Sequence, residues 1–113
     1  MANTFLNAKS DLTKTDLTTV YTVPTATTAI VKSILVSEDA GSGTTIDVTL
    51  VDASGTIFSL FKAKAVGSNT TVEFLTQPLV LEESEVLKVQ AAQANELHVV
   101  ASILQVKPRQ VVT

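Results

Sequence analysis

Hydrophobic and polar residues alternate with a period of two along much of the chain. In the segment 44–51, Thr-Thr-Ile-Asp-Val-Thr-Leu-Val, the apolar residues Ile46, Val48 and Leu50 alternate with polar ones. A strand places alternate side chains on opposite faces, whereas a helix would scatter these three residues around its surface. The segment therefore predicts a β-strand with one buried face.

Further segments have the same β-branched, alternating character and are separated by turns rich in glycine, proline, asparagine and aspartate. These segments are 19–23, 29–36, 56–62, 70–75, 78–81, 85–91 and 97–106. Their near-regular spacing predicts an all-β fold, an antiparallel β-sandwich of about eight strands with extended N- and C-terminal arms. A jelly roll shares this alternation and spacing, so both arrangements stay open.

Two turns can be located from their residues. Pro24 lacks a backbone N–H and restricts Val23 to extended geometry, so one strand should end there and another should begin after a short turn. The Gly41–Gly43 segment lacks the lysine and following helix of a phosphate-binding loop. We therefore expect it to form a hairpin tip.

The last strand segment, 97–106, carries apolar residues on both faces. Leu97, Val99, Ala101 and Ile103 fall on one face, while Val100 and Leu104 fall on the other. Such a strand is either covered on both sides or lies at a subunit contact.

Composition narrows the class of protein. The chain has 113 residues, the length of one domain, and it has no cysteine, so disulfides and thiolate metal sites are impossible. Its 8 basic and 11 acidic residues give a net charge of -3, which argues against nucleic-acid binding. The apolar runs are too short for a membrane helix, and the first residues are not typical of a secretory signal. We expect a soluble protein with neither nucleic-acid nor membrane partners.

Candidate chemistry is sparse. The single histidine, His98, lies inside a predicted strand with no serine–acid pattern near it, so it is expected to be structural or on the surface. Acidic residues cluster at Glu38–Asp39 and at 82–85, in predicted turns where solvated charge is the ordinary state. The sequence predicts no catalytic residue, no metal site and no cofactor, and thus no enzyme.

The two ends of the chain differ from the strand-rich middle. We expect residues 1–15 to form an N-terminal arm, residues 16–107 the sandwich and residues 108–113 a C-terminal tail. The arm carries two apolar residues, Phe5 and Leu6, that could dock on a partner. Frayed termini are the alternative interpretation.

The segments "VYTVPTATTAIVKSILV" and "LVLEESEVLKVQA", followed by "LHVVASILQV", resemble the small structural proteins of tailed bacteriophages, notably those of marine cyanobacterial phages. The resemblance covers nearly the whole chain and is one of scaffold pattern. Many such proteins have Gly-Asp as the turn before the late strand, where this chain has Ser84 and Glu85. The turn type at this position is therefore open.

This resemblance implies a virion component that assembles with copies of itself or with other virion proteins. The first hypothesis is a capsid decoration protein, expected to be a trimer, that binds the major capsid protein. The second is a structural protein of the neck, tail or fibre. The third, from another class, is a carbohydrate- or receptor-binding module, against which the scarcity of aromatic residues counts.

Overall fold

The structure is a computed structural model that describes residues 2–107, and this part of the chain consists of strands, turns and loops without a helix that could cross a membrane. The strands are β1 (Ala2–Leu12), β2 (Thr18–Thr22), β3 (Thr28–Glu38), β4 (Thr44–Val51), β5 (Ile57–Val66), β6 (Thr71–Glu73), β7 (Leu79–Leu81), β8 (Val86–Ala91) and β9 (Leu97–Lys107). The predicted all-β class is confirmed.

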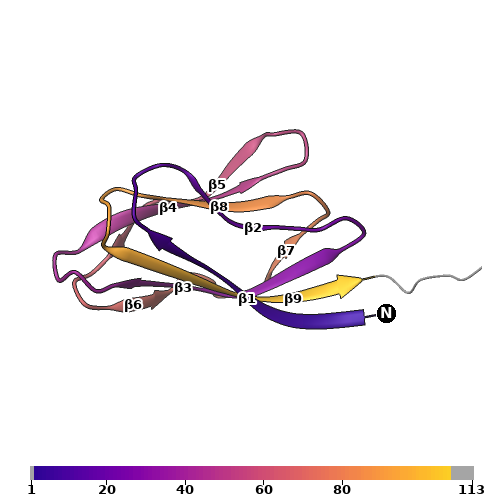
Figure 1. Cartoon of the computed structure of the whole chain (residues 1–113), viewed down its shortest axis with the longest axis horizontal. Helices are drawn as coiled ribbons and strands as arrows, with labels where there is room; N and C mark the ends of the chain where they lie inside the picture. Colours follow the sequence, from indigo (N-terminus) through magenta and orange to yellow (C-terminus); the bar gives the residue numbers. More distant parts are fainter. Residues whose placement is uncertain (1, 108–113) are drawn as a thin grey trace, which may run out of the picture.

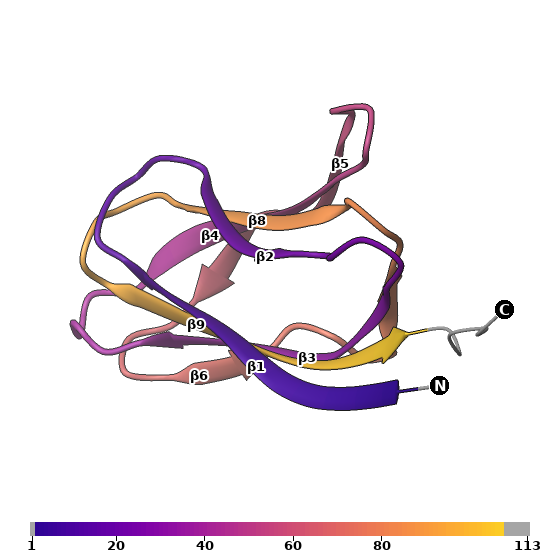
Figure 2. The ribbon, with the colours of Figure 1, turned by 45° about the vertical axis from the view of Figure 1, so that its right-hand side comes forward.

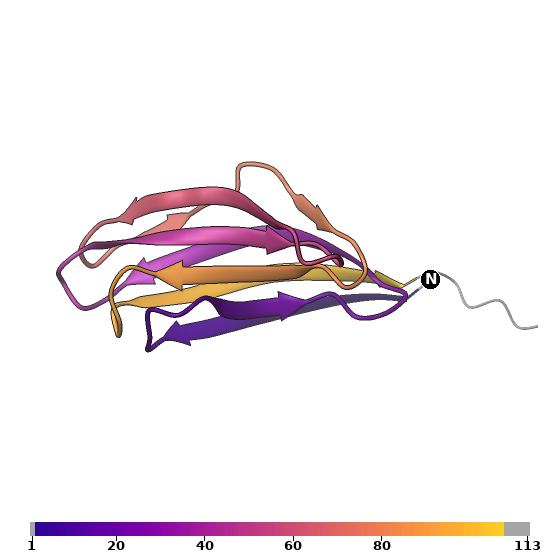
Figure 3. The same ribbon diagram turned by 90° about the horizontal axis from the view of Figure 1, so that it is seen from above.

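The strands form two antiparallel sheets packed face to face (Figures 1 and 2). Sheet A has the order β1-β9-β3-β6, with β7 also paired to β3, and sheet B has the order β2-β8-β4-β5. Successive strands alternate between the two layers along much of the chain. Seen from above, the layers overlie each other and their strands run roughly along the long axis of the molecule (Figure 3). The predicted antiparallel sandwich is therefore also confirmed.

The strand pairs are nested, which distinguishes the jelly roll from other sandwiches. β1 pairs with β9, β2 with β8, β3 with both β6 and β7, and β4 with β5. The first half of the chain thus pairs with the second half in reverse order, as in one long hairpin rolled into two sheets. This strand order is that of a jelly roll in which β6 and β7 share one strand position.

The core lies between the sheets and follows the alternation in the sequence. On β9, Leu97, Val99, Ala101 and Ile103 are all at most 1% exposed. On β4, Ile46 and Val48 are buried in the same way. The prediction is therefore confirmed for β9 and for Ile46 and Val48, whereas Leu50 is only partly buried and Thr49, predicted to point outward, is 8% exposed.

Residues 2–12 do not form an arm outside the sandwich, which corrects the expectation for segment 1–15. They form β1, which pairs along its whole length with β9, from Ala2 opposite Lys107 to Leu12 opposite Leu97. Leu12 is 1% exposed and belongs to the core. The sequence did not predict this strand because its inward positions include the small residues Ala8 and Ser10, which make the alternation of hydrophobic and polar residues weak.

The turn at Pro24 is confirmed, whereas the hairpin expected at Gly41–Gly43 is wrong. β2 ends at Thr22 and β3 begins at Thr28. The Gly41–Gly43 loop connects β3 in sheet A to β4 in sheet B, so it crosses between the layers. A hairpin and a loop that crosses between sheets use the same turn residues, so the local sequence does not distinguish them. Which of the two forms depends on the distant strands with which β3 and β4 pair.

The type of turn before β8, which the sequence left open, follows from the backbone conformation of Ser84. This residue has φ = 68°, a left-handed conformation that glycine adopts most easily. The N–H of Glu85 donates to the carbonyl oxygen of Glu82 at 3.0 Å and closes the turn. A glycine at this position, as in the proteins that the chain resembles, would meet the same backbone requirement. The predicted C-terminal tail, 108–113, lies outside the described residues.

Candidate functional site

An apolar row crosses the outer face of sheet A, the face that points away from sheet B. Phe5 on β1 lies opposite Leu104 on β9, Leu104 lies opposite Ile30 on β3, and Ile30 lies opposite Val80 on β7. The four residues therefore occupy one register position across four neighbouring strands. We call them the apolar row.

Much of this row is in contact with solvent. Phe5 is 74% exposed and Val80 is 55% exposed, while Leu104 and Ile30 are partly exposed. Leu35, on the same face, is 38% exposed. A cross-strand row of this kind stabilises a sheet only modestly when water covers it. Contiguous apolar surface is a common mark of an interaction site.

The two residues predicted to dock on a partner point in opposite directions. Phe5 lies on the outer face, in the apolar row, whereas Leu6 lies opposite Ile103 and packs against the core. A shallow hollow of about 320 Å³ adjoins Phe5 and is also lined by Asn7, Lys32 and Ser102. The side chain available to a partner is therefore that of Phe5, and its docking role stays a prediction.

A second row on the same face ends in opposite charges. Lys9 on β1 lies opposite Val100 on β9, Val100 opposite Leu35 on β3, and Leu35 opposite Glu73 on β6. We call these four residues the charged row. It lies four residues along β9 from the apolar row, on the same side of the sheet because side chains alternate with a period of two.

Glu73 is held in place within its own chain. Burial raises the pKa of its carboxyl group, but hydrogen bonds from the Ser33 hydroxyl and the Ile34 backbone N–H outweigh this effect and lower the pKa overall. The N–H of Leu75 also donates to this carboxylate, at 3.2 Å. Glu73 is therefore an ionised and oriented negative charge at the β6 edge.

His98 lies on the outer face of sheet A, between two acidic residues. Its Nε2 lies 3.2 Å from Oδ1 of Asp11 and its Nδ1 lies 3.6 Å from Oδ2 of Asp39. The His98 and Asp11 side chains are 42% and 64% exposed, so the pairs are surface contacts. The arrangement lacks a nucleophile, and the structural or surface role predicted for His98 fits it.

Glu38 differs from the solvated turn residue that the sequence indicated, because it is only 2% exposed. Its carboxylate accepts hydrogen bonds from four backbone N–H groups, those of Gly41, Ser42, Gly43 and Asn69. The bond from Asn69 has the largest effect, and together with the others it lowers the pKa of Glu38 to about 2 against the effect of burial. Glu38 thus ties the 39–43 loop to the loop before β6.

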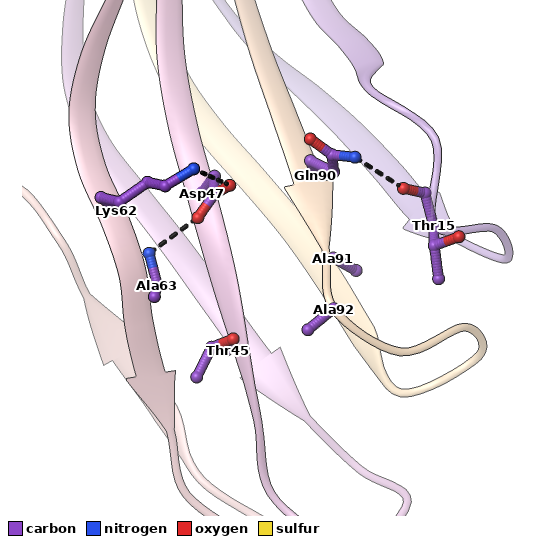
Figure 4. A pocket seen from close by; sticks show the side chains of 8 residues that line it. All are labelled: Thr15, Thr45, Asp47, Lys62, Ala63, Gln90, Ala91 and Ala92. Carbon is purple, nitrogen blue, oxygen red and sulfur yellow. Dashed lines mark hydrogen bonds and ion pairs between the residues drawn. The ribbon is translucent and has the colours of Figure 1, made fainter.

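The outer face of sheet B carries a polar pocket of about 500 Å³ (Figure 4). Oδ1 of Asp47 accepts the backbone N–H of Ala63 at 2.7 Å, and its Oδ2 lies 3.4 Å from Nζ of Lys62. Nε2 of Gln90 donates to the carbonyl oxygen of Thr15 at 3.0 Å. The remaining lining residues are Thr45, Ala91 and Ala92.

A β-bulge shapes this pocket. The register between β4 and β5 shifts between Ile46 and Val48, and Ala63 on β5 has φ = 50°. Bulges twist the local strand and redirect side chains, and they are common beside functional sites. A second hollow, of about 540 Å³, shares Asp47, Lys62 and Gln90 with the first. The second hollow is also lined by Leu17 and Ile57, so the outer face of sheet B combines a polar pocket with a neighbouring, more apolar hollow.

The β4–β5 hairpin projects away from the two layers (Figures 1 and 2). It exposes two large apolar residues, Ile57 at 58% and Phe58 at 50%. Asp52 closes its turn, and a hydrogen bond from the Ser54 hydroxyl, with others from the backbone, lowers the pKa of the Asp52 carboxyl group. The hairpin is a second exposed apolar surface, separate from the apolar row.

Within residues 2–107, no three His, Cys, Asp or Glu side chains converge as metal ligands would. The carboxylates of Glu38, Asp52 and Glu73 are each held by hydrogen bonds from their own chain. The surfaces that remain for function are the outer face of sheet A, the polar pocket and the β4–β5 hairpin. Sequence reasoning found Phe5 but missed the row, because the row joins strands far apart in the chain.

Comparisons with known proteins bear on the fold. No family model matches the chain, and no curated protein matches it. A protein of Bacillus endospore appendages, a family of disulfide-linked pili, has a TM-score of 0.60 at 9% identity, over 96% of this chain and 88% of that chain. A pentameric capsid protein from metagenomic phage sequences has a TM-score of 0.49 at 16% identity, over 91% and 60%. A capsid chain of Helicobacter pylori bacteriophage KHP30 has a TM-score of 0.45 at 12% identity, over 96% and 95%. At these identities the likeness concerns the fold alone.

Proposed function

We propose that the protein is a non-enzymatic structural protein of a virion, a capsid decoration protein that binds the major capsid protein and assembles with copies of itself. The observation that carries the proposal is the apolar row, which crosses the outer face of sheet A without being covered by another part of residues 2–107. The resemblance to structural proteins of tailed bacteriophages supports the same role.

The β4–β5 hairpin is the proposed attachment point on the shell. Ile57 and Phe58 are exposed at the projecting end of the molecule, and apolar anchors of this kind fill pockets on a partner surface. If the apolar row serves self-assembly, the hairpin leaves a separate surface for the shell. A subunit with two separate apolar surfaces can bind a partner and a second copy at the same time.

The test is binding of the purified protein to virus particles that lack it, followed by counting bound copies. Decoration predicts saturable binding in proportion to the major capsid protein, and Phe58→Ser should weaken it at least ~tenfold. Binding of only a few copies would move the assignment to the neck, tail or fibre. Absence of binding would overturn both structural roles. The native mass of the free protein distinguishes the trimer that the sequence led us to expect from a dimer or a monomer.

Assembly into a pilus of the disulfide-linked kind is a poor fit. The Bacillus protein belongs to a family of disulfide-linked pili. This chain has no cysteine, so copies of it cannot be joined by disulfides. Any assembly of this chain must therefore depend on contacts other than disulfides.

Carbohydrate binding is the second candidate, favoured by the polar pocket on sheet B. Asp47, Lys62 and Gln90 offer the acceptors and donors that hydroxyl groups of a sugar require. A glycan array tests it directly, with Asp47→Asn as the variant. Reproducible binding that this substitution reduces would support the pocket, whereas binding unaffected by it would place the sugar elsewhere.

A further inference from the structure

We infer that the outer face of sheet A binds a second copy of this chain, face to face, about a two-fold axis that runs parallel to the strands between β9 and β3. The inference rests on the proposed function, because it specifies how the subunit assembles with itself. In this arrangement the apolar row and the charged row both form part of the dimer interface.

The apolar row is complementary to itself under this symmetry. The axis places β9 of one copy over β3 of the other, and β1 of one copy over the edge that β6 and β7 share. Phe5 then faces Val80 of the second copy, and Leu104 faces Ile30. Each contact occurs twice, as an isologous interface requires. The row would form a dry centre of four apolar pairs.

The charged row identifies a second copy as the partner. Lys9 lies at its β1 end and Glu73 at its β6 end, with Val100 and Leu35 between them. The same axis that joins the apolar rows places Lys9 of each copy opposite Glu73 of the other. The two reciprocal ion pairs thus lie at the two ends of the charged row, on one side of the apolar row. Complementary charges of this kind fix the orientation of a complex more than they strengthen it.

Other orientations lose this match. A two-fold axis perpendicular to the strands would place β1 over β1, so Lys9 would never lie over Glu73 at the opposite edge of the sheet. The positions of the charges therefore select one of the two simple arrangements.

The size of the face predicts a weak dimer. Four strand positions at a spacing of about 4.8 Å, over the nine residues of β9 from His98 to Val106, give a projected area of about 500 Å². A standard interface buries about 800 Å² on each partner. We therefore expect a dimer that dissociates on dilution.

The first experiment measures native mass over a concentration series for three proteins. The wild type should shift from monomer to dimer as its concentration rises. Phe5→Ser with Val80→Ser should raise the dissociation constant at least ~tenfold. The matched control, Ile57→Ser with Phe58→Ser, makes similar changes at residues of similar exposure on the hairpin and should leave the constant unchanged. A wild type that stays monomeric, or a control that weakens the dimer equally, would overturn the inference.

The second experiment tests the axis by exchanging charges. Lys9→Glu and Glu73→Lys should each abolish the homodimer, because each creates two like-charge contacts. An equimolar mixture should form a heterodimer, since every charged position again meets its opposite. A mixture that stays monomeric, or single variants that dimerise as the wild type does, would refute this arrangement.

Glu73→Lys also removes hydrogen bonds within the chain, so its folding must be checked by circular dichroism. If it does not fold, Lys9→Glu is mixed with the wild type instead. That heterodimer contains one repulsive and one attractive contact, so its dissociation constant should lie between those of the two homodimers. Equal constants for all three dimers would count against the contact.

Particle binding separates this inference from the proposed function. A dimer that responds to these variants but does not bind particles would refute the decoration role alone. A protein that binds particles while remaining a monomer in both experiments would refute the dimer alone.

Discussion

Replacing Leu12 by alanine tests whether β1 is an integral part of the sandwich. Leu12 is 1% exposed and lies opposite Leu97, which is fully buried. The substitution removes three buried carbon atoms, which costs about 2.5 kcal/mol in transfer free energy. Partial collapse at an edge strand limits the added cavity term, so we expect a total of about 3 kcal/mol. That is a large share of the ~5–15 kcal/mol by which a domain is stable.

The assay is urea denaturation followed by circular dichroism, at a protein concentration low enough to keep the chain monomeric. Phe5→Ala on the same strand is the control, because Phe5 is 74% exposed and its loss should change the free energy of unfolding by less than about 0.5 kcal/mol. In a parallel thermal denaturation, the melting temperature should fall by about 10–20 °C for Leu12→Ala but not for Phe5→Ala. Equal effects of the two substitutions, or none from either, would show that β1 is not packed as described.

Three further predictions concern other parts of the fold. The pKa of Glu38 is about 2 in the folded state, below its ordinary 4.5, so its ionised form stabilises the fold above pH 4.5 and this contribution is lost as the pH falls toward 2. In denaturation experiments at several pH values, the free energy of unfolding of Glu38→Gln should therefore fall less steeply with decreasing pH than that of the wild type. Ser84→Gly should raise the free energy of unfolding by about 0.5–1 kcal/mol because Ser84 has φ = 68°, whereas Ser84→Ala should give no such gain in the same assay. Val48→Asp should unfold the protein by burying an unpaired charge, while Asp47→Asn on the opposite face should leave the circular dichroism spectrum native.

The sequence predicted those parts of the fold in which apolar residues alternate strongly. The inward residues inferred for β9, and Ile46 and Val48 on β4, are buried. The alternation on β4 fails after Val48, where Thr49 is buried and Leu50 only partly buried, because the register with β5 shifts there. Pro24 marked a strand boundary because its missing N–H acts locally, whatever the rest of the chain does. Strand existence and face are thus encoded within a few neighbouring residues.

Features that depend on distant pairing could not be predicted in this way. β1 is recognisable as a strand only beside β9, which supplies its hydrogen bonds along the whole register. Glu38 is a buried carboxylate only because Asn69, far along the chain, completes its set of N–H donors. The apolar row likewise joins four strands whose order a jelly roll determines and local patterns do not.

The outward side of sheet A is more apolar than the fold requires. Ile30, Leu35 and Leu104 lie at positions where threonine would favour a strand as well and would leave less apolar surface in water. Their side chains point away from the core, so they add little to the packing between the sheets. In a monomer they would chiefly lower solubility and favour association. The outer face of sheet B carries a polar pocket beside Asp47 in the same chain, so jelly-roll geometry does not by itself require an apolar outer face. The outward apolar residues of sheet A are best explained if this face is covered in the assembled state.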